Sequence, residues 1–76
     1  MAIVRKLTPI KLERDTKHSD VEDCTYSIIY GDDGSKSLQI DTYGSAQRKF
    51  PGKKSQSLRF TPEALDQLRR ILAEEL

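Results

Sequence analysis

The residues from Arg48 to Phe60, RKFPGKKSQSLRF, combine five basic side chains with two aromatic rings and contain no acidic group. The whole chain of 76 residues has a formal net charge of only +1, so its positive charge is concentrated in this stretch. Cations neutralise phosphates, and aromatic rings stack on bases that no second strand covers. The stretch therefore predicts contact with single-stranded nucleic acid. Because basic patches are a weak signal, a solvated, solubilising loop is the alternative interpretation.

The predicted contacts are of three chemical kinds. Five cations would neutralise phosphates, two aromatic rings would stack on bases, and two polar side chains would add hydrogen bonds. The cations are Arg48, Lys49, Lys53, Lys54 and Arg59. The aromatic rings are those of Tyr43 and Phe50, and the polar side chains are Ser55 and Gln56. Contacts of this kind read no particular base, so the sequence preference should be weak, and they favour neither DNA nor RNA.

The residues do not predict an enzyme, a metal site or a cofactor. Cys24 and His18 are the only cysteine and histidine, so no zinc cluster is expected and no nucleophile–base pair is evident. The acidic pairs at Asp32-Asp33 and in the run 20–23 lack the spacing of a calcium loop and are interpreted as turn residues. We interpret Cys24 as a small buried side chain and His18 as a solvated loop residue.

Strand-like alternation predicts the sheet that must hold these side chains. A hairpin is predicted with strands at 24–31 and 36–43, because Asp33-Gly34 supplies the positive φ that such turns require. A first strand at 3–13 is expected to bend near Pro9 or to break into two, and a fourth strand follows at 55–60. We interpret Tyr26 and Tyr30 as core residues. If Leu38 and Leu58 face a helix, then Gln39, Asp41, Tyr43, Ser57 and Arg59 point away from it.

A helix is predicted over 62–75. Thr61 suits the N-cap, Pro62 the first helical position, and Glu63 the positive end of the helix dipole. The apolar stripe of this helix consists of Leu65, Leu68, Ile71, Leu72 and Leu76. We therefore expect one α+β domain spanning 1–76, with a four-stranded antiparallel curved sheet followed by one C-terminal helix packed on one face.

Such a short chain with only 36% hydrophobic residues builds a thin core. Because Cys24 has no second cysteine to pair with, we expect association into a homodimer, with the apolar stripe of the helix as the interface. No secretory segment or apolar run long enough for a membrane span is evident. A lone thiol then suits the cytoplasm of a bacterial or phage-infected cell, or the nucleus of a eukaryote.

The segment SLQIDTYGSAQRKFPGKKSQSLRFTPEALDQLRRIL resembles the single-stranded DNA-binding domain of the transcriptional coactivator positive cofactor four and its small bacterial and phage relatives. The resemblance covers about the last half of the chain. Pro51-Gly52-Lys53-Lys54 with Ser57-Leu58 corresponds to the basic stretch of the family, Thr61-Pro62-Glu63 to its helix start, and Tyr43 to the first of two aromatics. The chain departs from the family at Asp41, Gly44 and Ser55-Gln56.

This resemblance implies a homodimer that associates through its helices and holds single-stranded DNA on curved sheet surfaces. A role in transcription or replication would follow. The alternative function is a protein–protein interaction module, an adaptor or inhibitor, that uses the sheet face or an open sheet edge. An apolar exposed patch in place of basic groups would favour this alternative.

Overall fold

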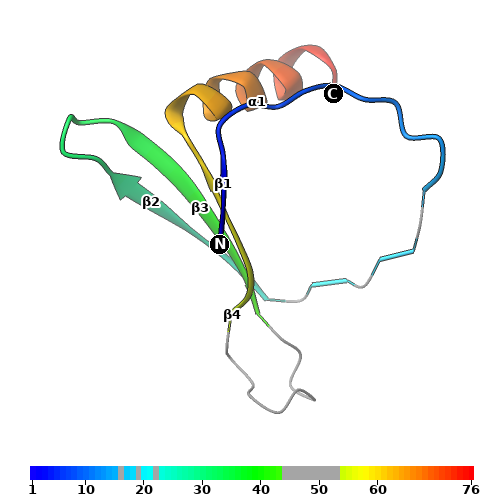
Figure 1. The fold of residues 1–76 in the computed structure, drawn as a ribbon, viewed down its shortest axis with the longest axis horizontal. Coiled ribbons are helices and arrows are strands. Elements are labelled where there is room, and N and C mark those ends of the chain that lie inside the picture. Colours follow the sequence, from blue (N-terminus) through cyan, green and yellow to red (C-terminus); the bar gives the residue numbers. More distant parts are fainter. Residues whose placement is uncertain (16, 19, 22, 44–53) are drawn as a thin grey trace.

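The computed structural model describes residues 1–15, 17–18, 20–21, 23–43 and 54–76 (Figure 1). It contains four strands and one C-terminal helix, so the predicted α+β class is confirmed. The elements are β1 (Ala2–Val4), β2 (Cys24–Tyr30), β3 (Lys36–Tyr43), β4 (Lys54–Phe60) and α1 (Pro62–Glu74). The bounds of the last four differ from the predicted ones by at most one residue at either end.

The sheet is mixed, and the prediction of a purely antiparallel sheet is wrong. Its strand order is β1-β4-β3-β2, and both β2 and β4 run antiparallel to β3. Strand β1 pairs with β4 in parallel, with Ala2 opposite Leu58 and Val4 opposite Phe60. Alternation of side chains reports which residues share a face, but it does not report the direction of the neighbouring strand.

The predicted first strand at 3–13 is also wrong beyond Val4, because the chain leaves the sheet there. The backbone of Leu7 bonds instead to a side chain of α1: its N–H donates to Gln67 Oε1 at 2.8 Å, and its carbonyl accepts from Gln67 Nε2 at 3.1 Å. The amide of Gln67 thus satisfies both backbone groups that a neighbouring strand would have satisfied. Figure 1 shows this N-terminal segment passing alongside α1.

The β2–β3 turn forms where the sequence predicts it. Gly34 has φ +82°, the positive value expected there. The N–H of Gly34 donates to the Gly31 carbonyl at 3.0 Å, and the N–H of Gly31 donates to the Ser35 carbonyl at 2.8 Å. Asp33 Oδ1 accepts from the Ser35 N–H at 3.0 Å. This pattern is a tight turn followed by a glycine bulge, a common three-residue hairpin connection.

Helix α1 begins at a capped end. Thr61 Oγ1 accepts from the N–H of Ala64 at 3.3 Å, and the Thr61 N–H donates to the carbonyl of Val4 at 3.0 Å. This residue therefore joins the helix start to β1, and α1 contacts β3 and β4. No helix among the described residues is long and apolar enough to cross a membrane.

The apolar core of the single chain is very small. Within the described part of the chain, Ala64 is the one fully buried apolar residue. The interpretation of Tyr26 and Tyr30 as core residues is wrong, since they are 74% and 69% exposed. Cys24 is exposed as well, contrary to expectation. All three lie on β2, which is an edge strand of the sheet formed by the described residues.

Candidate nucleic-acid interface

Strand register separates the sheet into two faces of different chemistry. Directly opposed residues share a face, and alternation sends the next pair to the other one. Gln39 lies opposite Arg59 and Asp41 opposite Ser57, whereas Leu38 lies opposite Phe60. We call the first side the polar face; it carries Thr25, Gln39, Asp41, Tyr43, Lys54, Ser57 and Arg59, together with Ile3, Ser27, Ile29 and Ser37 toward the edges of the sheet. We call the second side the apolar face; its apolar and aromatic residues are Tyr26, Ile28, Tyr30, Leu38, Ile40, Leu58 and Phe60, and it also carries Cys24, Lys36, Thr42 and Gln56.

Arg59 is held on the polar face by an uncharged partner. Its Nε and Nη2 donate to Gln39 Oε1 at 3.0 and 2.6 Å. Gln39 is only 7% exposed. A neutral amide fixes the guanidinium without cancelling its charge, and the remaining N–H donors of the fork stay available to a ligand. Arg59 is therefore an oriented cation on the polar face.

Asp41 lies beneath this surface and is 2% exposed. Its carboxylate accepts from Gln39 Nε2 at 3.2 Å and from Ser57 Oγ at 2.5 Å. Lys54 Nζ lies 3.4 Å from Asp41 Oδ2. Within the described part of the chain, no buried side-chain nitrogen or oxygen lacks a hydrogen-bond partner. The carboxylate is thus covered and satisfied, not presented to an approaching anion.

These contacts lower the pKa of Asp41 below its ordinary 3.8. The hydrogen bond from Ser57 is the largest cause; the bond from Gln39 and the charge of Lys54 act in the same direction, while burial opposes them. Asp41 is therefore ionised at neutral pH. Lys54 and Arg59 carry one more charge than Asp41, so these three residues of the polar face are together positive.

Tyr43 stands at the end of β3. Its hydroxyl forms a 2.9 Å hydrogen bond with Thr25 Oγ1 on β2, which anchors the tip of the half-buried side chain. The register of β3 and β4 shifts between Thr42 and Tyr43, where Tyr43 lies opposite Lys54. The ring and the ammonium therefore lie at the same end of the central strand pair.

The structure brings together some of the predicted contacts but not all. Tyr43, Lys54 and Arg59 share the polar face, and Ser55 is exposed on β4. Gln56 lies opposite Thr42 and so belongs to the opposite side of the sheet from Arg59. The predicted contacts at Arg48, Lys49, Phe50 and Lys53 lie outside the described residues.

Sequence reasoning placed Gln39 and Asp41 on one face with Ser57 and Arg59, as the register does, but missed the hydrogen bonds that they form there. The available signal was the pairing of Gln39-x-Asp41 with Ser57-x-Arg59, in which Ser57 and Arg59 can each find an acceptor on the adjacent strand. The predicted dimer residues differ in exposure. Leu65, Leu68 and Ile71 are half-buried within the chain, whereas Leu72 and Leu76 are 54% and 91% exposed.

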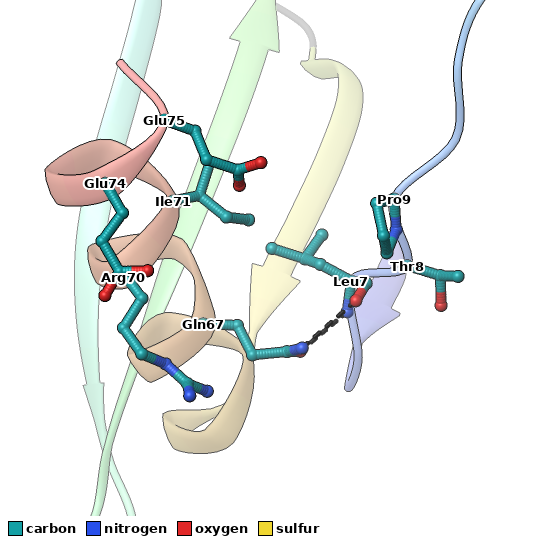
Figure 2. A pocket seen from close by; sticks show the side chains of 8 residues that line it. All are labelled: Leu7, Thr8, Pro9, Gln67, Arg70, Ile71, Glu74 and Glu75. Atoms are coloured by element: carbon teal, nitrogen blue, oxygen red, sulfur yellow. Dashed lines mark hydrogen bonds between the residues drawn. The ribbon is translucent and has the colours of Figure 1, made fainter.

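A hollow lies between the N-terminal segment and α1 (Figure 2). Leu7, Thr8 and Pro9 form one side, and Gln67 spans to Leu7 from the helix. The remaining lining residues of α1 and its C-cap are Arg70, Ile71, Glu74 and Glu75. The residues that the structure describes form no group that could hold a metal ion, here or elsewhere.

Comparison of the chain with protein-family models, curated proteins and solved structures finds no match. The resemblance to the positive cofactor four family therefore stays a prediction.

Proposed function

We propose that this protein binds single-stranded nucleic acid on the polar face of its sheet, acts as a homodimer and is not an enzyme. The observation that carries the proposal is the oriented charge of Arg59. A guanidinium that bonds to buried, neutral Gln39 is preorganised for a phosphate oxygen, because its side chain is already ordered before the ligand arrives. Lys54 adds a second, exposed cation at the other end of the polar face.

Asp41 supports this function instead of opposing it. An exposed carboxylate on the same face would repel phosphate, but this one is covered by Ser57 and Lys54. It also orients Gln39: because the Gln39 amide donates to Asp41, its carbonyl oxygen faces Arg59. Asp41 thus positions the cation that we propose to contact the ligand.

The preference for a single strand comes from Tyr43 and from the sequence that joins β3 to β4. Residues 44–53 contain Arg48, Lys49, Lys53 and Phe50, and no acidic residue. Stacking on an aromatic ring contributes about 1–3 kcal/mol per base and requires that the base be unpaired. Duplex DNA, whose bases are hidden, should therefore bind more weakly than a single strand of equal length.

Fluorescence anisotropy with a labelled oligonucleotide across a salt series tests the proposal. Five phosphate contacts predict a log–log slope near −3.5, from about −0.7 per contact on a single strand. Arg59→Gln should flatten the slope by about 0.7. Tyr43→Ala should instead weaken binding at every salt concentration with the slope unchanged, because stacking releases no counterions.

Lys36→Gln is the matched control. It also removes one positive charge from the sheet. Lys36 lies opposite Tyr30, however, and therefore on the apolar face. Its salt slope should equal that of the unmodified protein. If Lys36→Gln flattens the slope as much as Arg59→Gln does, binding follows net charge and the polar face is not the site.

The second candidate function is a protein–protein interaction module. It is favoured by the apolar face, where Tyr26, Ile28 and Tyr30 are 74%, 44% and 69% exposed. Absence of oligonucleotide binding at low salt, or a preference for duplex, would overturn the nucleic-acid proposal in favour of this one.

A further inference from the structure

Strand β2 forms an open edge of the sheet. Its residues CTYSIIY include no charged residue and no proline, and its pairing with β3 runs without a bulge. Proteins normally protect an edge of this length with lysines, prolines or bulges, because the unpaired backbone groups otherwise recruit another strand. The outer edge of β2 has none of these protections.

The hairpin determines which backbone groups point outward. The N–H of Gly31 bonds to the carbonyl of Ser35, and hydrogen-bonded pairs alternate along an antiparallel ladder. The residues of β2 that exchange hydrogen bonds with β3 are therefore Ile29, Ser27 and Thr25. The backbone groups of the alternate residues therefore face the open edge. They belong to Cys24, Tyr26, Ile28 and Tyr30.

We propose that this edge pairs with the same strand of a second copy, antiparallel, about a two-fold axis at Ser27. Tyr26 then lies opposite the partner's Ile28, and Cys24 lies opposite the partner's Tyr30. Outward-facing residues meet outward-facing residues, so each of these pairs exchanges two hydrogen bonds. A register shifted by two residues would still pair outward-facing residues with outward-facing residues, but it would leave residues of β2 without a partner.

Side chains of β2 fit this pairing. Ser27 meets its own copy at a non-hydrogen-bonded position, where backbones approach to about 4.5 Å between Cα atoms and a small side chain is accommodated. On the other side of the sheet, Tyr26 and the partner's Ile28 form an aromatic–β-branched pair, one of the favourable cross-strand combinations. A two-fold interface must be self-complementary, and an uncharged strand opposes no like charges across the axis.

We assign a second copy as the partner of this edge because the apolar core of the single chain is very small. Ala64 is the one fully buried apolar residue among those described, while β2 exposes two tyrosines at about 70%. Pairing about an axis perpendicular to the sheet would also place both polar faces on the same side of one continuous sheet. The proposal rests neither on nucleic-acid binding nor on the apolar stripe of α1.

Disulfide trapping tests this register. In a Cys24→Ser background, Ser27→Cys places two thiols across the axis, within the Cα separation of 4.4–6.8 Å that a disulfide spans. Oxidised glutathione accepts the two electrons and two protons as the intermolecular bond forms. We expect a covalent dimer on a non-reducing gel. Thr25→Cys in the same background is the matched control, since its own copy would lie about 13 Å away along the strand.

At least tenfold more cross-linking at residue 27 than at residue 25 supports the proposal. Equal cross-linking at the two positions, or none at residue 27, overturns it. Sedimentation gives an independent test: Ile28→Lys should weaken self-association at least tenfold, whereas Ala73→Lys, an exposed change of equal charge on α1, should not. Unchanged association of a folded Ile28→Lys variant would likewise contradict the proposal.

Discussion

Strands β2 and β4 flank the same central strand, β3, yet their side chains lie in opposite surroundings. On the polar face, Arg59 of β4 is half-buried and bonded to Gln39, one of the most buried residues described. On β2, two tyrosines are largely exposed. In this comparison, polar side chains on the inner strands are buried, whereas aromatic side chains on the edge strand are exposed. The buried polar groups satisfy one another, and the exposed groups of the edge are those that we propose to meet a second copy.

The largest expected effect comes from the helix that supports this sheet. Replacing Leu68 and Leu72 by aspartate places charges in the apolar stripe, where they would be desolvated in the predicted dimer. We expect a protein that is unfolded in circular dichroism or, if folded, one that has lost in sedimentation the association that depends on α1. Arg69→Ala is the control, because its exposed ion pair with Asp66, at 2.7 Å, contributes no more than about 1 kcal/mol. A stable folded monomer of the unmodified chain at micromolar concentration would contradict the dimer.

Acid titration should reveal the polar cluster around Asp41. Folding lowers the pKa of Asp41 below its ordinary value of 3.8. The contribution of the ionised Asp41 to the stability of the fold is therefore complete above that ordinary value, and it is lost as the pH falls through the pKa of the folded state. Urea unfolding at low pH should therefore show a decline that Asp41→Asn reduces. Ser57→Ala removes the largest cause of the shift, so the decline should be smaller and should end at a higher pH. An unchanged acid response in both variants would show that the cluster does not couple to folding.

The two glycines of the β2–β3 turn should respond differently to alanine. Gly34 has φ +82°, so Gly34→Ala forces a side chain into a left-handed conformation at a cost of about 1–2 kcal/mol. At Gly31, an added Cβ would meet Ser35 Oγ at 2.6 Å and Asp33 Oδ1 at 2.9 Å, but both are ends of side chains that can rotate. We expect the smaller loss in the free energy of urea unfolding from Gly31→Ala. The reverse order would contradict the role assigned to Gly34.

The smallest effect is expected at the exposed edge itself. Lys36 Nζ lies 5.6 Å from the centre of the Tyr30 ring, a cation–π contact worth about 0.5–1 kcal/mol at an exposed site. Lys36→Gln, which keeps most of the side-chain length, should lower the free energy of urea unfolding by no more than this. Tyr30→Leu should lose the same contact, and the two changes together should cost less than their sum.

The hairpin and the helix could be predicted from the sequence because their signals are local. The turn depends on Asp33-Gly34, and the helix start depends on Thr61-Pro62, residues that act within one turn of the chain. The two faces of β3 and β4 could also be predicted, because alternation follows from strand geometry alone. These features required no knowledge of what packs against them.

Only the tertiary structure decided the direction of β1, the path of Leu7 along α1, and the opposite burial of Asp41 and Tyr26. Each depends on contacts between residues far apart in the chain, such as Leu7 with Gln67 and Asp41 with Ser57. An alternating apolar strand has the same pattern whether it lies at the centre of a sheet or at its edge. Asp41 is buried because β3 has β4 and β2 on its two sides, and Tyr26 is exposed because β2 has only β3.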